Sequence, residues 1–80
     1  MDFELVDYVE VNNTIQLEGV VVASVKRANF SEIKLQSTTG EKLNLKVWGN
    51  EHSFKDGEVL AATTYIKMYN NERQLNVSQL

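Results

Sequence analysis

The stretch FSEIKLQSTTGEKLNLKVW, residues 30–48, decides the fold of this chain. Apolar and polar side chains alternate on both sides of residues 38–40 (TTG), which is the pattern of a β-hairpin with a short turn. A three-residue loop ending in Gly sets Leu35 opposite Leu43, so that the apolar side chains share one face. A two-residue loop would instead set Leu43 opposite Gln36. Because a slip of one residue turns every side chain to the other face, we expect the first register.

The same alternation extends over most of the chain. Val, Ile and Thr are frequent, short polar breaks separate the apolar runs, and there is no Pro. The predicted strands cover residues 14–27, 30–37, 41–48, 58–69 and 72–78. One parity of the first strand is apolar or Gly throughout: Ile15, Leu17, Gly19, Val21, Ala23 and Val25. Gly19 in this run predicts a bulge or a sharp bend. The 80 residues thus predict a single small all-β domain.

The last two predicted strands form a second hairpin around Asn70-Asn71. Asn tolerates positive φ angles, so these two residues suit a tight turn. The turn sets Ile66 opposite Leu75 inside the domain. The outward residues of the fourth strand are then Tyr65, Lys67 and Tyr69.

Two segments lie outside the predicted strands. Residues 49–57 (GNEHSFKDG) are polar and too short for a substantial helix, so we expect a loop there. Residues 1–13 form an acidic segment ahead of a barrel that covers residues 14–80. Alternating apolar positions in this segment suggest an extra strand or arm, whereas Val6 and Tyr8 would suit a helical turn. The sequence leaves both alternatives open.

The order and spacing of these pieces resemble the OB-fold nucleic-acid-binding domains, particularly those of replication protein A and the anticodon-binding type. The resemblance covers residues 14–80. It rests on the long first strand with Gly19 and on the motifs LNLKVWGN (43–50), KDGEVL (55–60) and YIKMYNNERQLNV (65–77). It implies a five-stranded Greek-key barrel that grips single strands or oligosaccharides. This chain departs from the family in having little or no helix between strands three and four, where the family helix closes the bottom of the barrel.

The register of the first hairpin places aromatic and basic side chains together on its outer face. Phe30 lies opposite Trp48, and Lys34, Lys42 and Lys46 share that face. Such a face can stack bases, at about 1–3 kcal/mol per base without selecting sequence, and can follow phosphates. Each aromatic side chain has an alternative role as a cap on the barrel core.

The OB arrangement implies that the first and last turns flank this face, and both turns carry basic residues. We therefore expect one groove that binds single-stranded nucleic acid, with single-stranded DNA favoured over RNA. The expected contact residues are Lys26, Arg27, Phe30, Lys34, Lys46, Trp48, Lys67, Tyr69 and Arg73.

The charge of the chain counts against this hypothesis, because phosphate binding depends on Lys and Arg. The net charge is −3, and residues 1–25 hold five acids and no base. Residues 26–80 hold eight bases and six acids, which makes that part of the chain net positive. The distribution weakens the objection without removing it.

Other functions find little support in the sequence. Without Cys, and with His52 as the single histidine, no metal constellation or disulfide is expected. No activated nucleophile or phosphate loop is recognisable, so we expect neither an enzyme nor a cofactor or small-molecule substrate. The acidic start is unlike a signal peptide and no apolar run is long enough to span a membrane, so we expect an intracellular protein.

One alternative to nucleic-acid binding is a protein–protein interaction module. In that hypothesis the acidic N-terminal segment contacts a partner, or mimics nucleic acid in a basic groove. The apolar run at Val20 and Val22 favours some cover, either by residues 1–11 or by another subunit of a homo-oligomer or hetero-complex. Oligosaccharide binding is allowed by the fold but has no particular support in the sequence.

Overall fold

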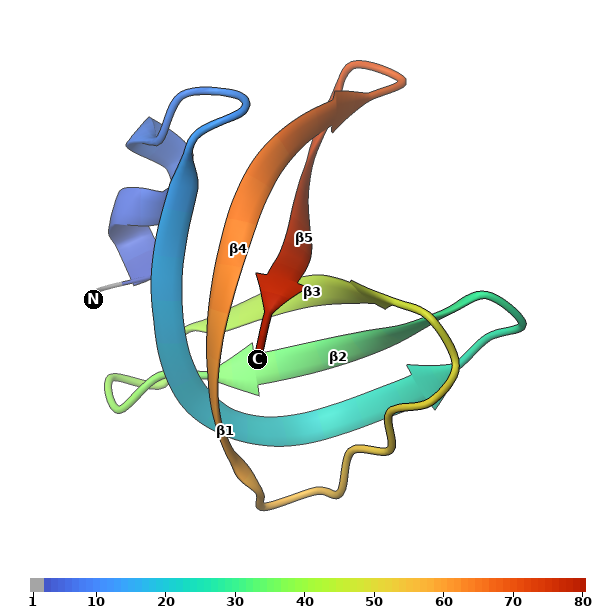
Figure 1. Cartoon of the computed structure of the whole chain (residues 1–80). Coiled ribbons are helices and arrows are strands. Elements are labelled where there is room, and N and C mark those ends of the chain that lie inside the picture. The colour runs from blue at the N-terminus through green and yellow to red at the C-terminus, as the bar shows by residue number, and fades with distance from the viewer. Residues whose placement is uncertain (1–2) are drawn as a thin grey trace.

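Five strands close into a barrel in the computed structural model, which describes residues 3–80 (Figure 1). Around the barrel the strands follow the order β1-β2-β3-β5-β4, and β4 pairs with β1. All paired strands are antiparallel except β3 and β5, which are parallel. The strands are β1 (Thr14–Lys26), β2 (Phe30–Gln36), β3 (Lys42–Trp48), β4 (Val59–Tyr69) and β5 (Glu72–Gln79). The predicted all-β, five-stranded Greek-key barrel is confirmed.

Both hairpins have the predicted register. Leu35 pairs with Leu43 across β2 and β3, and Gly40 adopts a φ of 92° at the end of the turn. The β4–β5 pairing likewise follows the register expected from the Asn-Asn turn. Asn70 and Asn71 have φ angles of 51° and 66°, the left-handed conformation that a tight hairpin turn requires. The alternation of side chains and the length of each turn were sufficient to define these pairings.

Strand β1 belongs to both halves of the barrel because it bends. Its first part pairs with β4 and its second part with β2, and Val20 pairs with both neighbours. A Cβ atom on Gly19 would lie 2.5 Å from the backbone oxygen of Gln36. Only Gly permits so close an approach of the two chains at the bend.

The predicted alternation of inward and outward side chains in β1 is wrong after Val21, because a bulge lies between Val21 and Ala23. Ile15, Leu17 and Val21 are buried, as their alternation predicts, but Ala23 and Val25 are exposed. The extra residue at the bulge reverses which side chains point inward from there on. The uninterrupted apolar parity in the sequence gave no sign of this reversal.

A short 3-10 helix, η1 (Phe3–Tyr8), packs against one part of the barrel beside β1 (Figure 1). Phe3 and Val6 are buried and belong to the same apolar cluster as the strand residues. Their spacing of three residues places them on one side of a 3-10 helix. Of the two structures that the sequence left open for this segment, the helical turn is found, and the extra strand does not form over Phe3–Tyr8.

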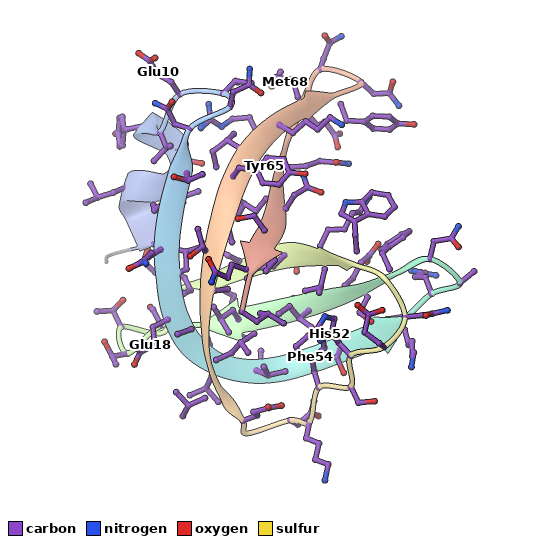
Figure 2. The ribbon with its side chains drawn as sticks, in the orientation of Figure 1. Glu10, Glu18, His52, Phe54, Tyr65 and Met68 are labelled. Atoms are coloured by element: carbon purple, nitrogen blue, oxygen red, sulfur yellow. The ribbon has the colours of Figure 1, made fainter. Side chains whose placement is uncertain are left out.

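Residues 49–58, between β3 and β4, contain no helix. Phe54 of this segment packs against the core, and its backbone oxygen accepts a hydrogen bond from the Ser24 hydroxyl at 3.2 Å. Figure 2 shows His52 beside Phe54, and their ring centroids are 6.0 Å apart. The loop therefore covers the barrel with a single aromatic side chain. Among residues 3–80, no helix is long and apolar enough to cross a membrane.

Candidate nucleic-acid interface

An aromatic pair lies on the outer face of the β2–β3 hairpin. Phe30 begins β2, Trp48 ends β3, and the two residues pair across the strands. Their ring centroids are 5.2 Å apart and the ring planes are inclined by 54°. Trp48 is 51% exposed and Phe30 is half-buried, and neither belongs to the buried core cluster. The half-exposed indole of Trp48 offers aromatic surface to solvent, on which a planar ring can stack.

Lys46 brings a positive charge to this aromatic pair. Its Nζ atom lies 4.4 Å from the ring centroid of Phe30 and 5.0 Å from that of Trp48. At these distances the ammonium group is attracted by the negative faces of both rings. An exposed aromatic surface and a positive charge are therefore in contact in the structure.

Asn76 on β5 holds the indole ring of Trp48 in place. The Nε1–H group of Trp48 donates a hydrogen bond of 2.8 Å to Oδ1 of Asn76. Asn76 pairs with Lys46 on β3 and with Tyr65 on β4, so it stands in the middle of this face. Although it points outward, Asn76 is only 1% exposed. The hydrogen bond orients the exposed indole, so less rotational freedom is lost when a ring stacks on it.

A groove of about 670 Å³ extends from Lys46 along the same face. It opens where β3 and β5 separate, since the pairing of these strands is confined to Lys46 with Asn76 and Val47 with Val77. Its lining includes the buried residues Ile33, Leu45 and Leu75 and, from η1, Val6 and Asp7. The outward residues that line it are Val25, Glu32, Lys34, Asn44, Lys46 and Gln74. Lys46 lines the groove and also contacts the aromatic pair.

Further predicted residues border this face. Arg27 lies with Nε 3.9 Å from Oε1 of Glu32, a solvent-exposed pair that leaves the guanidinium available. Lys67 pairs with Gln74 of the groove wall, and Tyr69 is exposed at the tip of the β4–β5 hairpin. Figure 1 shows the β1–β2 turn and the β4–β5 turn on the same side of the barrel. By register, Phe30, Lys34, Lys46 and Trp48 share the outer face of the β2–β3 hairpin. Arg27 lies in the β1–β2 turn, and Lys67 and Tyr69 lie in the last part of β4.

Two predicted residues are placed differently. Lys26 pairs with the buried Ser31, so it has the inward parity at the end of β1 and does not share the face of Phe30. Arg73 lines the far end of the groove, but its guanidinium donates hydrogen bonds to the backbone oxygens of Val6 and Val9. Its charge is engaged in holding the N-terminal segment. The geometry thus separates these two residues from the aromatic pair.

Comparison with known structures identifies the architecture. One chain of a replication protein A heterotrimer bound to ssDNA is similar to this protein, with a TM-score of 0.68 and 15% sequence identity. The match covers 89% of this chain and 57% of that one, so this chain spans little more than half the length of its structural relative. This chain has the OB fold. No protein-family model and no curated protein matches the sequence.

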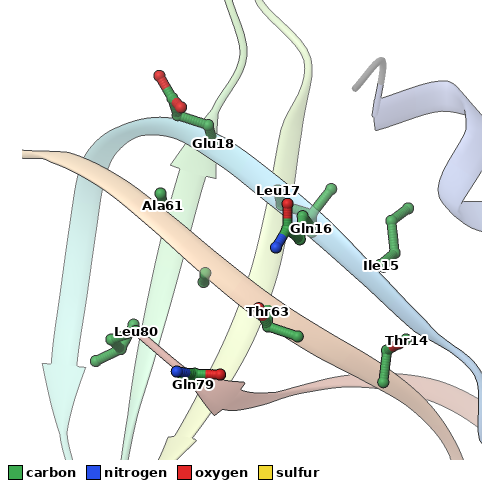
Figure 3. Close-up of a pocket in the computed structure, with 10 residues that line it drawn as sticks. Thr14, Ile15, Gln16, Leu17, Glu18, Ala61, Thr63, Gln79 and Leu80 are labelled. Carbon is green, nitrogen blue, oxygen red and sulfur yellow. The ribbon is translucent and has the colours of Figure 1, made fainter.

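A second hollow lies on a different face of the OB barrel. It measures about 790 Å³ and lies between the outer sides of β1 and β4, beside the last residues of the chain (Figure 3). Among residues 3–80, Glu18 is the only one with a charged side chain that lines this hollow, and Ala61, Thr63 and Leu80 are among the others. A hollow with one carboxylate and no base repels phosphate. The smaller groove is therefore the better candidate for nucleic acid.

Metal-dependent chemistry has no obvious location in the described part of the OB domain. No group of three or more His, Cys, Asp or Glu residues is placed to hold a metal ion among residues 3–80. His52 stacks on Phe54 and lies 3.6 Å from a carboxylate oxygen of Glu51. These contacts are those of a surface side chain on a loop.

Sequence reasoning missed Asn76 as a member of the site. Its outward position followed from the predicted hairpin register, but a lone Asn in a strand carries no chemical signal. Its importance comes from the parallel pairing of β3 with β5, which brings Asn76 beside Lys46 and Trp48. Tyr65, its partner on β4, is half-buried on the same face (Figure 2). Parallel pairing of strands so distant in sequence has no local sequence signature.

Proposed function

We propose that this OB-fold domain binds single-stranded DNA. Bases stack on Phe30 and Trp48, and phosphates lie against Lys46 and the cations that border the groove. The observation that carries the proposal is the exposed aromatic pair with the Lys46 ammonium over both rings. Aromatic platforms beside a line of positive charge are the recurrent means of binding single strands without reading their sequence.

Two considerations favour DNA over RNA. The solved structure that resembles this chain is described as bound to ssDNA, although at 15% identity the resemblance itself extends to the fold alone. Thymine also carries a C5-methyl group that uracil lacks. This methyl group adds apolar surface to a base stacked on Trp48 and so strengthens the stack.

The fluorescence of Trp48, the only tryptophan, provides the direct test. We expect titration with oligothymidylate to quench it to saturation, and oligouridylate of equal length to bind more weakly. If three or four of the cations Arg27, Lys34, Lys46 and Lys67 contact phosphates, log K falls against log salt with a slope of about −2 to −3. An absence of quenching at low salt, together with an absence of binding by a labelled oligonucleotide, would refute the proposal. The acidic N-terminal segment would then be examined for a protein partner.

A further inference from the structure

We propose that Asn76 contacts the base that stacks on Trp48, donating a hydrogen bond from its side-chain amide to an exocyclic carbonyl oxygen of that base. The inference rests on the proposed function and adds a base preference to it. Because Asn76 is only 1% exposed, the contact requires a neighbouring side chain to move when the base binds. One position of the bound strand then favours thymine over adenine, while the remaining positions stay indifferent to sequence.

The unusual state of the Asn76 side chain is the first argument. Its Oδ1 atom accepts the hydrogen bond from Trp48, and because an indole nitrogen can only donate, this contact defines which end of the amide is oxygen. The Nδ2 atom is buried and has no hydrogen-bond partner among residues 3–80. A buried amide donor without a partner is costly, and such groups in native proteins call for an explanation. An acceptor supplied by a ligand would satisfy it.

The position of the amide is the second argument. Asn76 accepts a hydrogen bond from the edge of the Trp48 indole, and the indole is half-exposed. The edge of a base stacked on the indole would therefore lie beside the Asn76 amide. Asn76 also pairs with Lys46, whose ammonium lies over the two rings. A base that stacks there takes the place of the ammonium group, which can turn to a phosphate. Because Lys46 is the neighbour of Asn76 across β3 and β5, the proposed contact requires the Lys46 side chain to move aside when a base binds.

The depth of the donor determines which base it prefers. Nδ2 is recessed, so an oxygen that projects from a ring reaches it more readily than a nitrogen within a ring. Thymine presents two exocyclic carbonyl oxygens. The acceptors of adenine are ring nitrogens, and its exocyclic group is an amino donor. A buried donor therefore discriminates against adenine.

The test compares base preference in matched variants. The ratio of the Kd for oligoadenylate to the Kd for oligothymidylate is measured for the full chain, for Asn76→Asp and for Gln79→Ala. Asp keeps an acceptor for Trp48 and replaces the free amide donor with a carboxyl oxygen. The negative charge that a carboxylate adds weakens the binding of both oligonucleotides, so the ratio of the two Kd values reports mainly the loss of the donor. Gln79→Ala removes a side-chain amide from the same strand at the other hollow. We expect Asn76→Asp to lower the ratio about three- to tenfold and Gln79→Ala to leave it unchanged.

A second measurement needs no variant and is therefore independent of folding. In oligothymidylate, one thymine at a time is replaced by difluorotoluene, which has the shape of thymine without its carbonyl groups. We expect one position to lose about three- to tenfold in affinity for the wild-type chain. An unchanged ratio in Asn76→Asp, or tolerance of difluorotoluene at every position, would overturn the inference while binding itself persists. Absence of binding to any of these oligonucleotides would overturn the proposed function as well.

Discussion

At the scale of single residues, the side chain of Trp48 is exposed to solvent and is also held in one orientation by its neighbours. Half of its surface faces solvent, yet its indole edge is bonded to Asn76 and its ring contacts Phe30 and Lys46. An exposed tryptophan free to rotate would lose more entropy when a base stacks on it. The contacts of Trp48 with Asn76 and Phe30 therefore favour binding by holding the indole in place before a base stacks on it.

Replacing Trp48 should weaken binding far more than folding. We expect Trp48→Ala to lower affinity for oligothymidylate by about tenfold or more, since a stacked base contributes roughly 1–3 kcal/mol. Trp48→Phe keeps an aromatic ring but loses the hydrogen bond to Asn76 and part of the stacking area, so its loss of affinity should be smaller than that of Trp48→Ala. Fluorescence anisotropy of a labelled oligonucleotide measures both variants. If Trp48→Ala unfolds the domain with no selective loss of binding, the residue belongs to the core and not to the site.

At the scale of secondary-structure elements, β1 closes the barrel by passing from one set of partners to another. The bend at Gly19 and the bulge after Val21 occur within a few residues, and together they let one strand pair with both β4 and β2. The close approach of Gly19 to the backbone of Gln36 leaves no room for a Cβ atom at this bend.

Gly19→Ala should therefore destabilise the domain without touching the groove. The added methyl group would stand 2.5 Å from a backbone oxygen, which cannot move away as a side chain could. Overpacking of this kind costs about 1–3 kcal/mol of unfolding free energy. Urea denaturation followed by circular dichroism measures it. The neighbouring exposed position supplies a control, since Glu18→Ala should change stability by no more than about 0.5 kcal/mol. Equal stability of the two variants would contradict this account of the bend.

The helix η1 makes a separate contribution, as part of the core. Phe3 is buried against strand residues, whereas Leu5 in the same helix is exposed. Phe3→Ala should lower the unfolding free energy by about 3 kcal/mol, and Leu5→Ala by less than about 0.5 kcal/mol. Chemical denaturation of both variants tests this difference. Similar small losses would show that the segment is dispensable for the barrel.

At the scale of the whole molecule, the distribution of charge matters more than its sum. Glu10 and Glu18 lie on the side of the barrel away from the β1–β2 turn (Figure 2), and Glu18 lines the hollow between β1 and β4. The groove is lined by three bases, Lys34, Lys46 and Arg73, and by two acids, Asp7 and Glu32. A net charge of −3 for the chain is thus compatible with a small local excess of positive charge at the groove.

Removing one cation at the groove should alter the salt dependence measurably. Lys34 lines the groove, and we expect Lys34→Gln to reduce the slope of log K against log salt by about 0.7, the change for one phosphate contact on a single strand. Lys55 lies in the segment between β3 and β4, outside the groove, and Lys55→Gln should leave the slope unchanged. Equal effects of the two substitutions would mean that binding follows total charge and does not use the groove.

The sequence by itself determined the two hairpins and the side chains that share their outer face. Each hairpin closes over a turn of two or three residues, so turn chemistry and alternation leave one register that buries the apolar side chains. That register placed Phe30 opposite Trp48 and put Lys46 on the same face. Local physics was sufficient because every interacting pair lies close in the chain.

Only the tertiary structure decided how the hairpins meet. The bulge in β1, the hydrogen bonds of Arg73 to the N-terminal segment and the parallel pairing of β3 with β5 join residues far apart in sequence. Such contacts depend on how the barrel closes around its core, and the hydrophobic periodicity of the sequence does not predict them. For that reason the contact of Asn76 with Trp48, which joins the second hairpin to the first, could be identified only from the tertiary structure.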